Sequence, residues 1–432
     1  MKTKQSPVDL IGIGIGPFNL GLAALVDGLE EQTSLFFDDK PEFNWHPGMM
    51  INGTTLQVPF LADLVTMVDP RSPYSFLEYL REHGRLFSFY FYERFQIPRR
   101  EYNHYCQWVA EQLPQCQFGK RVIQIEEEED LWKVVVEDNE SGVFETYQAK
   151  NIVLGVGTTP VIPKIDGLSS EEEYIFHSAE FRKKEEIWKG SKRVTVVGSG
   201  QSAGEVFYEV LHNKSEEQQL NWLTRSRGFF PMEYSKLGLE HFSPDYTAYF
   251  YDLPQETKDA LLPKQDLLYK GISADTIASI YDLLYERTIG GKTERVHLQP
   301  LTELVGGEKG GRDGRYTLYF NQWEKENYFS LETDVLIMAT GYQQTIPSFL
   351  QGVEHLIKWD QQGRYDVGHH YEIKMKEKRQ HRMFVQNGEL HTHGPGAPDL
   401  GLGAHRNAHI INEITGREIY RLQDKNVFQC FG

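Results

Sequence analysis

The sequence predicts an α/β protein with two Rossmann-like dinucleotide-binding domains and a small, mainly helical segment. Two glycine fingerprints carry this prediction: Gly14-Ile-Gly16-Pro-Phe-Asn19 near the start of the 432 residues, and Gly198-Ser-Gly200-Gln-Ser-Ala203 near the middle. Each follows an apolar run of strand length and opens a segment with the apolar period of a helix. Two dinucleotides on one chain indicate hydride transfer between a nicotinamide and a flavin, which is oxidoreductase chemistry.

The first fingerprint follows a strand expected at residues 8–13 and opens a helix expected at 18–29. Gly14 permits the tight turn, Gly16 lets backbone amides approach a pyrophosphate, and the positive end of the helix faces the phosphates. The next strand ends at Asp38, whose carboxylate suits the ribose hydroxyls of adenosine. Asn19 stands where a third glycine or alanine is usual. We expect this unit to bind FAD through Gly12, Gly14, Gly16, Pro17, Asn19 and Asp38.

The second fingerprint follows an apolar run at 193–198 that has the composition of a buried parallel strand. The following helix is expected at 201–212, and the strand after it ends in Arg225-Ser-Arg227. An acid at this place would favour the bare ribose of NAD, whereas guanidinium groups suit the 2′-phosphate of NADPH. We therefore expect NADPH to bind here through Gly198, Gly200, Gln201, Ser202, Ala203, Arg225 and Arg227.

The two units are expected to alternate along the chain. A β-meander at 121–149 belongs to the first unit, and a buried strand at 334–342 is expected to pass the chain back to it. A helix at 275–284 is expected either to cover the substrate cleft or to pack as a structural helix. The expected segments are 1–165 (FAD-binding domain, first part), 166–232 (NADPH-binding domain, first part), 233–292 (helical substrate segment), 293–332 (NADPH-binding domain, return) and 333–432 (FAD-binding domain, second part).

Composition excludes several classes of protein. A net charge of −17 without a basic patch argues against nucleic acid and anionic membranes as partners. Three unpatterned cysteines, Cys106, Cys116 and Cys430, indicate neither a disulfide framework nor a metal site. No apolar run approaches the length of a membrane span, and the first strand follows directly on the N-terminus. We expect a cytoplasmic enzyme.

Beyond the fingerprints, several ordered motifs resemble the N-hydroxylating flavin monooxygenases of siderophore biosynthesis, the lysine/ornithine N-monooxygenase family. The resemblance covers essentially the whole chain. The motifs are Gly14-Ile-Gly-Pro-Phe-Asn-Leu, Asn44-Trp-His-Pro-Gly-Met49, Leu56-Gln-Val-Pro-Phe-Leu-Ala-Asp-Leu64, Asp69-Pro-Arg-Ser-Pro-Tyr-Ser-Phe-Leu77, Gly198-Ser-Gly-Gln-Ser-Ala203 and Ala339-Thr-Gly-Tyr342.

The resemblance implies a mechanism and further site residues. NADPH would reduce FAD, O₂ would add to the reduced flavin as a C4a-hydroperoxide, and a neutral primary amine would attack the distal oxygen. No protein nucleophile is required, so the protein must exclude water, retain NADP⁺ and align the amine. By similarity, Trp45, His46 and Gln57 act at the catalytic centre and also belong to the FAD site, which Met49, Thr340 and Leu400 join. Thr340, Gly341 and Tyr342 join the NADPH site.

A departure from the family motif bears on the substrate. Members that hydroxylate ornithine or lysine have a lysine that pairs with the α-carboxylate of the substrate, where this chain reads Phe60-Leu-Ala62-Asp-Leu64. Alanine cannot pair with a carboxylate, and an unpaired buried carboxylate costs several kcal/mol. The change at Ala62 therefore favours a substrate without a carboxylate.

Two further departures from the family motifs also favour a substrate without a carboxylate. Leu239 takes the place of a polar residue, asparagine in the ornithine enzymes, and Gly401 takes the place of a serine. Asp399 introduces a charge into a segment that is usually neutral. We expect Asp399 or Glu240 to hold the distal ammonium of an aliphatic diamine, with a helix cap as the alternative role for Asp399.

These observations predict a diamine N-monooxygenase that uses FAD, NADPH and O₂ on putrescine or cadaverine. One methylene is worth only about 1 kcal/mol of selectivity, so the two chain lengths are not separated here. The rival within the class is a lysine or ornithine monooxygenase whose carboxylate partner is Lys270, Arg71 or His405. The rival from another class is a flavoprotein that oxidises NADPH without oxygen transfer. A homo-oligomer, a tetramer, is implied by the resemblance alone.

Overall fold

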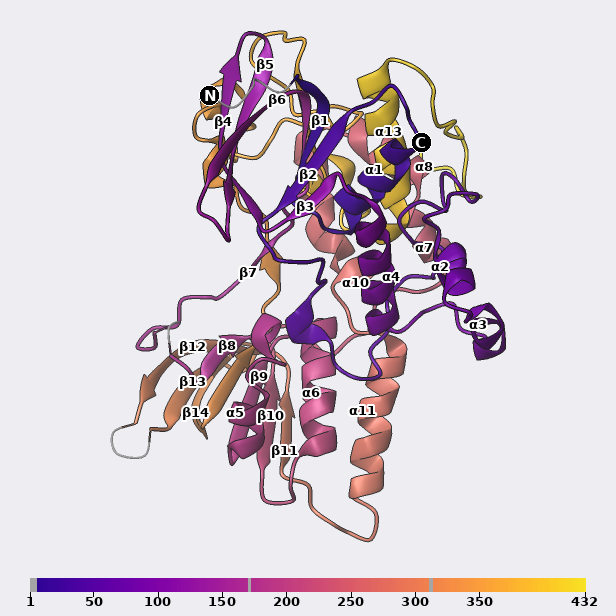
Figure 1. Ribbon diagram of the computed structural model, residues 1–432. Helices are drawn as coiled ribbons and strands as arrows, with labels where there is room; N and C mark the ends of the chain where they lie inside the picture. Colours follow the sequence, from indigo (N-terminus) through magenta and orange to yellow (C-terminus); the bar gives the residue numbers. More distant parts are fainter. Residues whose placement is uncertain (1–5, 170–171, 311–313) are drawn as a thin grey trace.

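The computed structural model describes residues 6–169, 172–310 and 314–432 of the chain. Two β-sheets lie at opposite ends of the molecule, and the linking strand β7 runs between them (Figure 1). Each sheet holds one of the two glycine fingerprints, which confirms the α/β fold with two Rossmann-type units. Within the described residues, no helix combines the length and the apolar character that crossing a membrane requires.

The first sheet has seven strands, and the long strand β6 (Phe144–Leu154) joins its two halves. The second half of β6 is parallel to β1 and β17, and its first half is antiparallel to β5. The meander expected at 121–149 is thereby confirmed. The other strands are β1 (Val8–Ile13), β2 (Ser34–Asp38), β3 (Cys116–Phe118), β4 (Lys120–Glu128), β5 (Leu131–Asp138) and β17 (Arg382–Val385), in the order β3-β2-β1-β6-β5-β4 with β17 on β6.

The faces of this sheet pack against different partners because alternate side chains of a strand point to opposite sides. Leu10 and Phe36 face a core built with the helices, whereas Ile11 and Phe37 face the side chains of the β4–β5 hairpin. The helices of the first unit are α1 (Pro17–Asp27), α2 (Phe76–Glu82), α3 (Leu86–Tyr92), α4 (Arg99–Gln112), α12 (Leu390–His393) and α13 (Gly403–Thr415), with 3₁₀ turns η1 (Pro47–Met49), η5 (Ser348–Leu350), η6 (Glu354–Leu356) and η7 (Leu400–Leu402).

The second sheet is a five-stranded parallel sheet in the order β11-β10-β9-β15-β8. Helix α6 packs on it, and α11 lies beside α6 (Figure 1). Its elements are β8 (Ile175–His177), η2 (Ser178–Glu180), α5 (Glu185–Gly190), β9 (Arg193–Val197), α6 (Gln201–Asn213), β10 (Gln219–Leu223), β11 (Val296–Gln299) and β15 (Val335–Met338).

Strand β15 corrects one expectation. The sequence predicts that residues from 333 onward belong to the first unit, yet β15 pairs in parallel with both β9 and β8 of the second. Its four residues are all buried, and a fully apolar strand is most stable in the middle of a parallel sheet. The chain returns one step later, where β16 (Tyr342–Gln343) pairs antiparallel with the outgoing β7 (Thr159–Pro160).

Strands β12 (Thr302–Lys309), β13 (Tyr316–Gln322) and β14 (Asn327–Thr333) form a separate antiparallel sheet. Tyr316 and Phe320 from this sheet share a core with Ile175 and Leu336 of the second sheet. The part of segment 293–332 that joins the second sheet itself is β11.

The segment expected to be mainly helical contains α7 (Lys236–Leu239), η3 (Glu240–Phe242), α8 (Pro244–Asp252), α9 (Gln255–Leu261), η4 (Leu262–Gln265), α10 (Asp266–Tyr269) and α11 (Ala274–Arg287). Ile280 of α11 is buried in the core of the second unit, so this helix has the structural role of the two expected for it. The C-terminal tail packs on the same segment, where Phe431 contacts the rings of His241 and Tyr246.

A loop from the first unit enters the second. Met49 and Ile51 are 3% exposed and belong to the apolar core around α6. Gly48 lies against η2 so closely that an added Cβ would stand 1.7 Å from the carbonyl oxygen of Ala179. The Trp-His-Pro-Gly-Met motif therefore fixes the two units against each other, which explains why glycine is required there.

Candidate functional site

A cleft of about 1730 Å³ runs between the two units and reaches both glycine fingerprints. The side chains that line the cleft include more basic than acidic groups, although the whole chain has a net charge of −17. Seven basic side chains line it against four acidic ones, and this balance suits a ligand with several phosphates. The basic residues are Lys40, Arg99, Lys120, Arg121, Lys164, Arg225 and Lys270; the acidic ones are Asp38, Asp39, Asp266 and Glu303.

The first glycine loop connects β1 to α1 at one end of the cleft. Gly14 has a φ of +83°, and an added Cβ would stand 2.5 Å from the carbonyl oxygen of Gly155, which follows β6. Gly16 begins α1 without a side-chain cap, and nothing lies within 4 Å of the position of its missing Cβ. That opening and the free amides of the first helical turn can receive a pyrophosphate. Asp38 lies beside them and accepts hydrogen bonds from the amides of Ile15 (2.7 Å) and Lys40 (2.9 Å).

The second glycine loop repeats this construction between β9 and α6. A Cβ at Gly198 would stand 2.2 Å from the carbonyl oxygen of Ala339, which follows β15. Gly200 begins α6, and the hydroxyls of Ser199 and Ser226 hydrogen-bond at 2.7 Å. That bond ties the glycine loop to the turn after β10. Two similarly built glycine loops therefore reach the same cleft.

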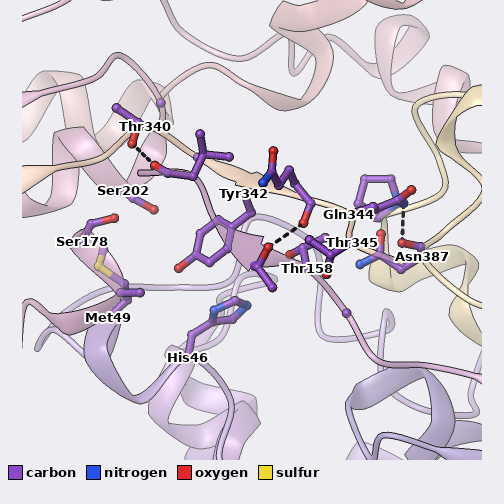
Figure 2. A pocket seen from close by; sticks show the side chains of 18 of the residues that line it. His46, Met49, Thr158, Ser178, Ser202, Thr340, Tyr342, Gln344, Thr345 and Asn387 are labelled. Carbon is purple, nitrogen blue, oxygen red and sulfur yellow. Dashed lines mark hydrogen bonds between the residues drawn. The ribbon is translucent and has the colours of Figure 1, made fainter. Parts of the chain in front are cut away.

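Between the two loops, side chains from both units converge (Figure 2). The rings of His46 and Tyr342 meet edge-on with centroids 5.8 Å apart, and Trp45 packs edge-on against His46 at 5.0 Å. Burial, and then the nearby charges of Arg99 and Lys40, lowers the pKa of His46 to about 4. His46 is therefore neutral at pH 7.

Gln57 lines the cleft, and a hydrogen bond from Tyr234, which is not a lining residue, holds it in place. The hydroxyl of Tyr234 lies 2.9 Å from the backbone oxygen of Gln57 and 3.1 Å from its Oε1, so it donates to this residue. Burial, with a contribution from the charge of Asp399, raises the pKa of Tyr234 to about 12, so the phenol stays protonated. The Gln57 side chain is thus oriented by a fixed donor.

An ion pair joins the units at the edge of the cleft. Both guanidinium nitrogens of Arg99, at the start of α4, reach the carboxylate of Glu205 on α6, at 2.8 and 2.9 Å. The two side chains are 11% and 3% exposed. Gln201 donates to the same carboxylate at 2.9 Å, and Arg99 also donates to the carbonyl of Met49. These bonds satisfy both buried charges.

Most of the predicted cofactor residues lie on the cleft, but four of the described ones do not. Gly12 is needed for packing, because a Cβ there would stand 2.1 Å from the ring of Phe36. Asn19 is fully buried, and its amide nitrogen donates to the carbonyls of Ile13, Gly14 and Val153, so it braces the loop from behind. Ala203 is buried in the core, and Arg227 lies outside the lining. The cleft is lined by Gly14, Gly16, Pro17, Asp38, Trp45, His46, Met49, Gln57, Gly198, Gly200, Gln201, Ser202, Arg225, Thr340, Gly341, Tyr342 and Leu400.

The four residues predicted to bind substrate lie behind or away from this lining. Asp399 stands between two lining residues, Pro398 and Leu400, and its Oδ1 caps η7 by accepting the amide of Gly401 at 2.7 Å. Burial raises the pKa of Asp399 to about 6. A Cβ at Gly401 would lie 3.7 Å from that of Ala62, so these two small residues face each other.

Glu240 has another role than the predicted one. Its carboxylate accepts the backbone amides of Phe428 (3.2 Å) and Gln429 (3.0 Å), so it anchors the C-terminal tail. Leu239, at the end of α7, is 40% exposed. Of the two roles expected for Asp399, the structure shows the helix cap, at η7.

Three functional residues were absent from the sequence analysis: Arg99, Glu205 and Tyr234. No local motif marks them, because each acts through a partner far away along the chain. In the lining segment 266–271 at α10, only Lys270 was considered from sequence, as an alternative partner for a substrate carboxylate.

Comparisons with known proteins agree on the family. The model of the L-lysine 6-monooxygenase/L-ornithine 5-monooxygenase family matches residues 6–344. A putrescine N-hydroxylase from Shewanella oneidensis is 42% identical, covering 98% of this chain and 84% of that protein. DfoA, a cadaverine monooxygenase from Erwinia amylovora solved with FAD, is 41% identical with a TM-score of 0.93 and 99% coverage of both chains. KtzI, an ornithine N-hydroxylase from Kutzneria sp. 744 solved with reduced FAD, NADP⁺ and L-ornithine, is 28% identical with a TM-score of 0.87, covering 95% of this chain and 99% of that one.

The buried ion pair between the units gives a stability prediction. Replacing Glu205 with glutamine leaves the Arg99 guanidinium buried without its counter-charge, so we expect the free energy of unfolding to fall by about 3 kcal/mol. Urea denaturation followed by tryptophan fluorescence measures this change. Glu209→Gln is the matched control on the same helix, because its nearest cation, Arg182, is 3.8 Å away. Equal stability of the Glu205 and Glu209 variants would contradict the assigned role of the pair.

Proposed function

We propose, given that this chain belongs to the L-lysine 6-monooxygenase/L-ornithine 5-monooxygenase family, that it hydroxylates one primary amine of an aliphatic diamine, putrescine or cadaverine. FAD, NADPH and O₂ take part, and the N-hydroxy diamine supplies the biosynthesis of a hydroxamate siderophore. We also propose that the enzyme is cytoplasmic and works as a homo-oligomer, a tetramer by family resemblance.

The observation that carries the substrate assignment is the group of small and acidic side chains behind the cleft. Ala62 and Gly401 face each other where amino-acid hydroxylases have a lysine and a serine, and Asp399 lies next to Gly401. Ala62 cannot pair with a substrate carboxylate, and the nearby cation Arg406 already pairs with Glu389 at 3.0 Å, whereas Asp399 offers a carboxylate to a substrate ammonium. A diamine has the second group and lacks the first, so its binding leaves no unpaired charge.

The three candidates for an alternative carboxylate partner are weak. Lys270 lines the cleft but already pairs with Asp266 at 2.8 Å. The side chain of Arg71 is 94% exposed, and burial lowers the pKa of His405 to about 4, which leaves it neutral. These observations disfavour a lysine or ornithine substrate.

The two glycine loops fit the two dinucleotides. Gly16 has open space where a side chain would be, so the first loop would hold the pyrophosphate of FAD, with Asp38 at its adenosine side. The second loop would hold NADPH, with Arg225 on its 2′-phosphate. When bound, FAD supplies hydride acceptance and activation of O₂.

The protein's side chains orient the groups that line the cleft and limit the positive charge near the reacting amine. Tyr234 fixes the amide of Gln57, which faces the cleft beside Trp45 and His46. Neutral His46 adds no positive charge beside an amine that must be unprotonated to react. Met49 and Tyr342 line the cleft (Figure 2), and their apolar surface would favour exclusion of water.

Purified, FAD-loaded protein, NADPH and O₂ with putrescine, cadaverine, lysine or ornithine test this function through the hydroxylamine formed. We expect product from the diamines. Product from an amino acid alone would overturn the substrate assignment. NADPH consumption that yields only hydrogen peroxide with all four amines would favour a flavoprotein without oxygen transfer.

A substitution at Asp399 tests how the distal ammonium is held. Asparagine keeps the cap of η7 but removes the charge, and a charge-assisted hydrogen bond is worth about 1.5–3 kcal/mol. For Asp399→Asn we therefore expect the KM for the diamine to rise roughly 10- to 100-fold, with little change in kcat. Steady-state hydroxylamine assays measure both constants.

Glu240→Gln is the matched control, because that carboxylate holds the tail and should leave the KM unchanged. The pH dependence gives a second readout. Asp399 is ionised above about pH 6, so the wild-type KM should rise as the pH falls below 6, and this rise should vanish in Asp399→Asn. A normal KM in the variant at every pH would remove Asp399 from the substrate site.

The choice of nicotinamide cofactor rests on Arg225. This arginine lines the cleft at the end of β10, whereas Arg227 lies outside the lining. Removal of one charge-assisted bond to the 2′-phosphate should raise the KM for NADPH about tenfold in Arg225→Ala and leave that for NADH unchanged. Stopped-flow flavin reduction measures both, with Arg227→Ala as the control. An equal effect of the two substitutions would contradict the assignment.

A further inference from the structure

His177 is a buried histidine behind the cleft, and both of its ring nitrogens have backbone partners. It ends strand β8, is 1% exposed, and lies in register with Met338 of β15. Its Nδ1 lies 3.1 Å from the amide nitrogen of Ala179, and its Nε2 lies 3.0 Å from the carbonyl oxygen of Gly341. A buried imidazole with two such partners is held in one orientation.

The two partners determine where the proton of this ring lies. A backbone amide can only donate, so Nδ1 of His177 accepts from Ala179 and carries no proton. The neutral ring then has its proton on Nε2, which donates to Gly341. Burial lowers the pKa of His177, in agreement with a neutral ring at pH 7. Each nitrogen therefore has one defined hydrogen bond.

The bond from Nε2 fixes the turn after β15. Gly341 has a φ of +85°, and its carbonyl oxygen also accepts the amide of Val161 at 2.9 Å. Tyr342, the next residue, packs edge-on against two imidazole rings, those of His177 at 5.1 Å and His46 at 5.8 Å between centroids. The histidine thus contacts both the backbone of the turn and the ring that faces His46.

The bond to Nδ1 fixes a second segment that meets the first unit. Ala179 belongs to η2, and a Cβ added to Gly48 would stand 1.7 Å from its carbonyl oxygen. The carbonyl of Gly48 also accepts the amide of Arg182 at 3.0 Å. Figure 2 shows Ser178, the first residue of η2, next to Met49. One imidazole therefore holds two segments of the second unit against the same motif of the first.

We propose that His177 is a positioning residue for the nicotinamide of NADPH. The two glycine loops reach one cleft, and hydride transfer requires the two ring systems to meet between them, where Tyr342 and His46 lie. The bond from Nε2 to Gly341 keeps Tyr342 in place beside His46. Misplacement by about 1 Å can lower a rate about 100-fold, so the position of this wall matters. The inference rests on the proposed use of NADPH and FAD and is independent of the amine.

The competing role for His177 is that of an N-cap for η2 alone, and two replacements separate the roles. Glutamine can bring its Nε2 near the position of the histidine Nε2 and donate to Gly341, but it has no acceptor at the Nδ1 position. Asparagine can bring its Oδ1 near the Nδ1 position and keep the cap, but it does not reach Gly341. If the bond to Gly341 positions the nicotinamide, glutamine preserves binding and asparagine does not.

Isothermal titration of the FAD-loaded protein with NADP⁺, without an amine, tests the proposal. We expect His177→Asn to raise the Kd for NADP⁺ about tenfold and His177→Gln to stay within about threefold of the wild type. Stopped-flow flavin reduction at saturating NADPH should slow at least about tenfold in His177→Asn and much less in His177→Gln. A retained FAD spectrum and an unchanged far-UV circular dichroism spectrum verify that the variants fold.

His381→Gln controls for the loss of a buried imidazole. His381 is 2% exposed and packs edge-on against Trp132 at 4.4 Å, beside the first sheet and outside the cleft lining, so both readouts should stay unchanged. Wild-type binding of NADP⁺ in His177→Asn, or a tenfold loss in His177→Gln, would overturn the proposal. Either variant suffices if the other does not fold. A wild type that fails to bind NADP⁺ would overturn the proposed cofactor too, whereas unaltered binding in the variants would leave the cofactor in place.

Discussion

The relative position of the two nucleotide units depends on the buried pair of Arg99 and Glu205. It joins the start of α4 in the first unit to the first turns of α6, the helix that carries the second glycine loop. Each charge would be costly alone in this setting, and together with Gln201 and the Met49 carbonyl they satisfy one another. The pair therefore fixes the distance between two ligands that must exchange hydride, and it does so at the rim of the cleft.

Local physical constraints explain which parts of the fold were predictable from sequence. Glycine is required at positions 14 and 198 because the backbone there lies close to the carbonyl oxygens of Gly155 and Ala339. Both glycines are part of the fingerprint motifs, so the motifs predict these turns. The strands and helices around them follow apolar patterns of period 2 or 3.6. For these reasons the two units, the glycine loops and the meander were predicted correctly, and most of the cofactor residues predicted with them line the cleft.

The errors concern contacts between distant parts of the chain. Asn19 looked like a ligand because of its place in the fingerprint, but its amide braces β6, and its oxygen accepts from Gln386. Glu240 was predicted to hold an ammonium group, but its carboxylate accepts backbone amides of the C-terminal tail. Arg99 and Glu205 are 106 positions apart, so no motif could reveal their pairing. A sequence pattern indicates the local structure around a residue. The roles of Asn19, Glu240, Arg99 and Glu205 depend instead on contacts with distant parts of the chain.

The distribution of charge then explains how one cleft can serve a polyanionic cofactor pair and a dicationic substrate. Four of the seven basic residues of the lining, Arg99, Lys120, Arg121 and Lys270, are already paired with carboxylates, and bound phosphates would offset the charge of the others. Asp399 lies just behind the lining, and burial holds its pKa near 6, so it is ionised at pH 7 yet gains most from a cation that enters its surroundings. Ala62 and Gly401 lie close beside this carboxylate and carry no charge of their own, so Asp399 is the proposed counter-charge for the distal ammonium.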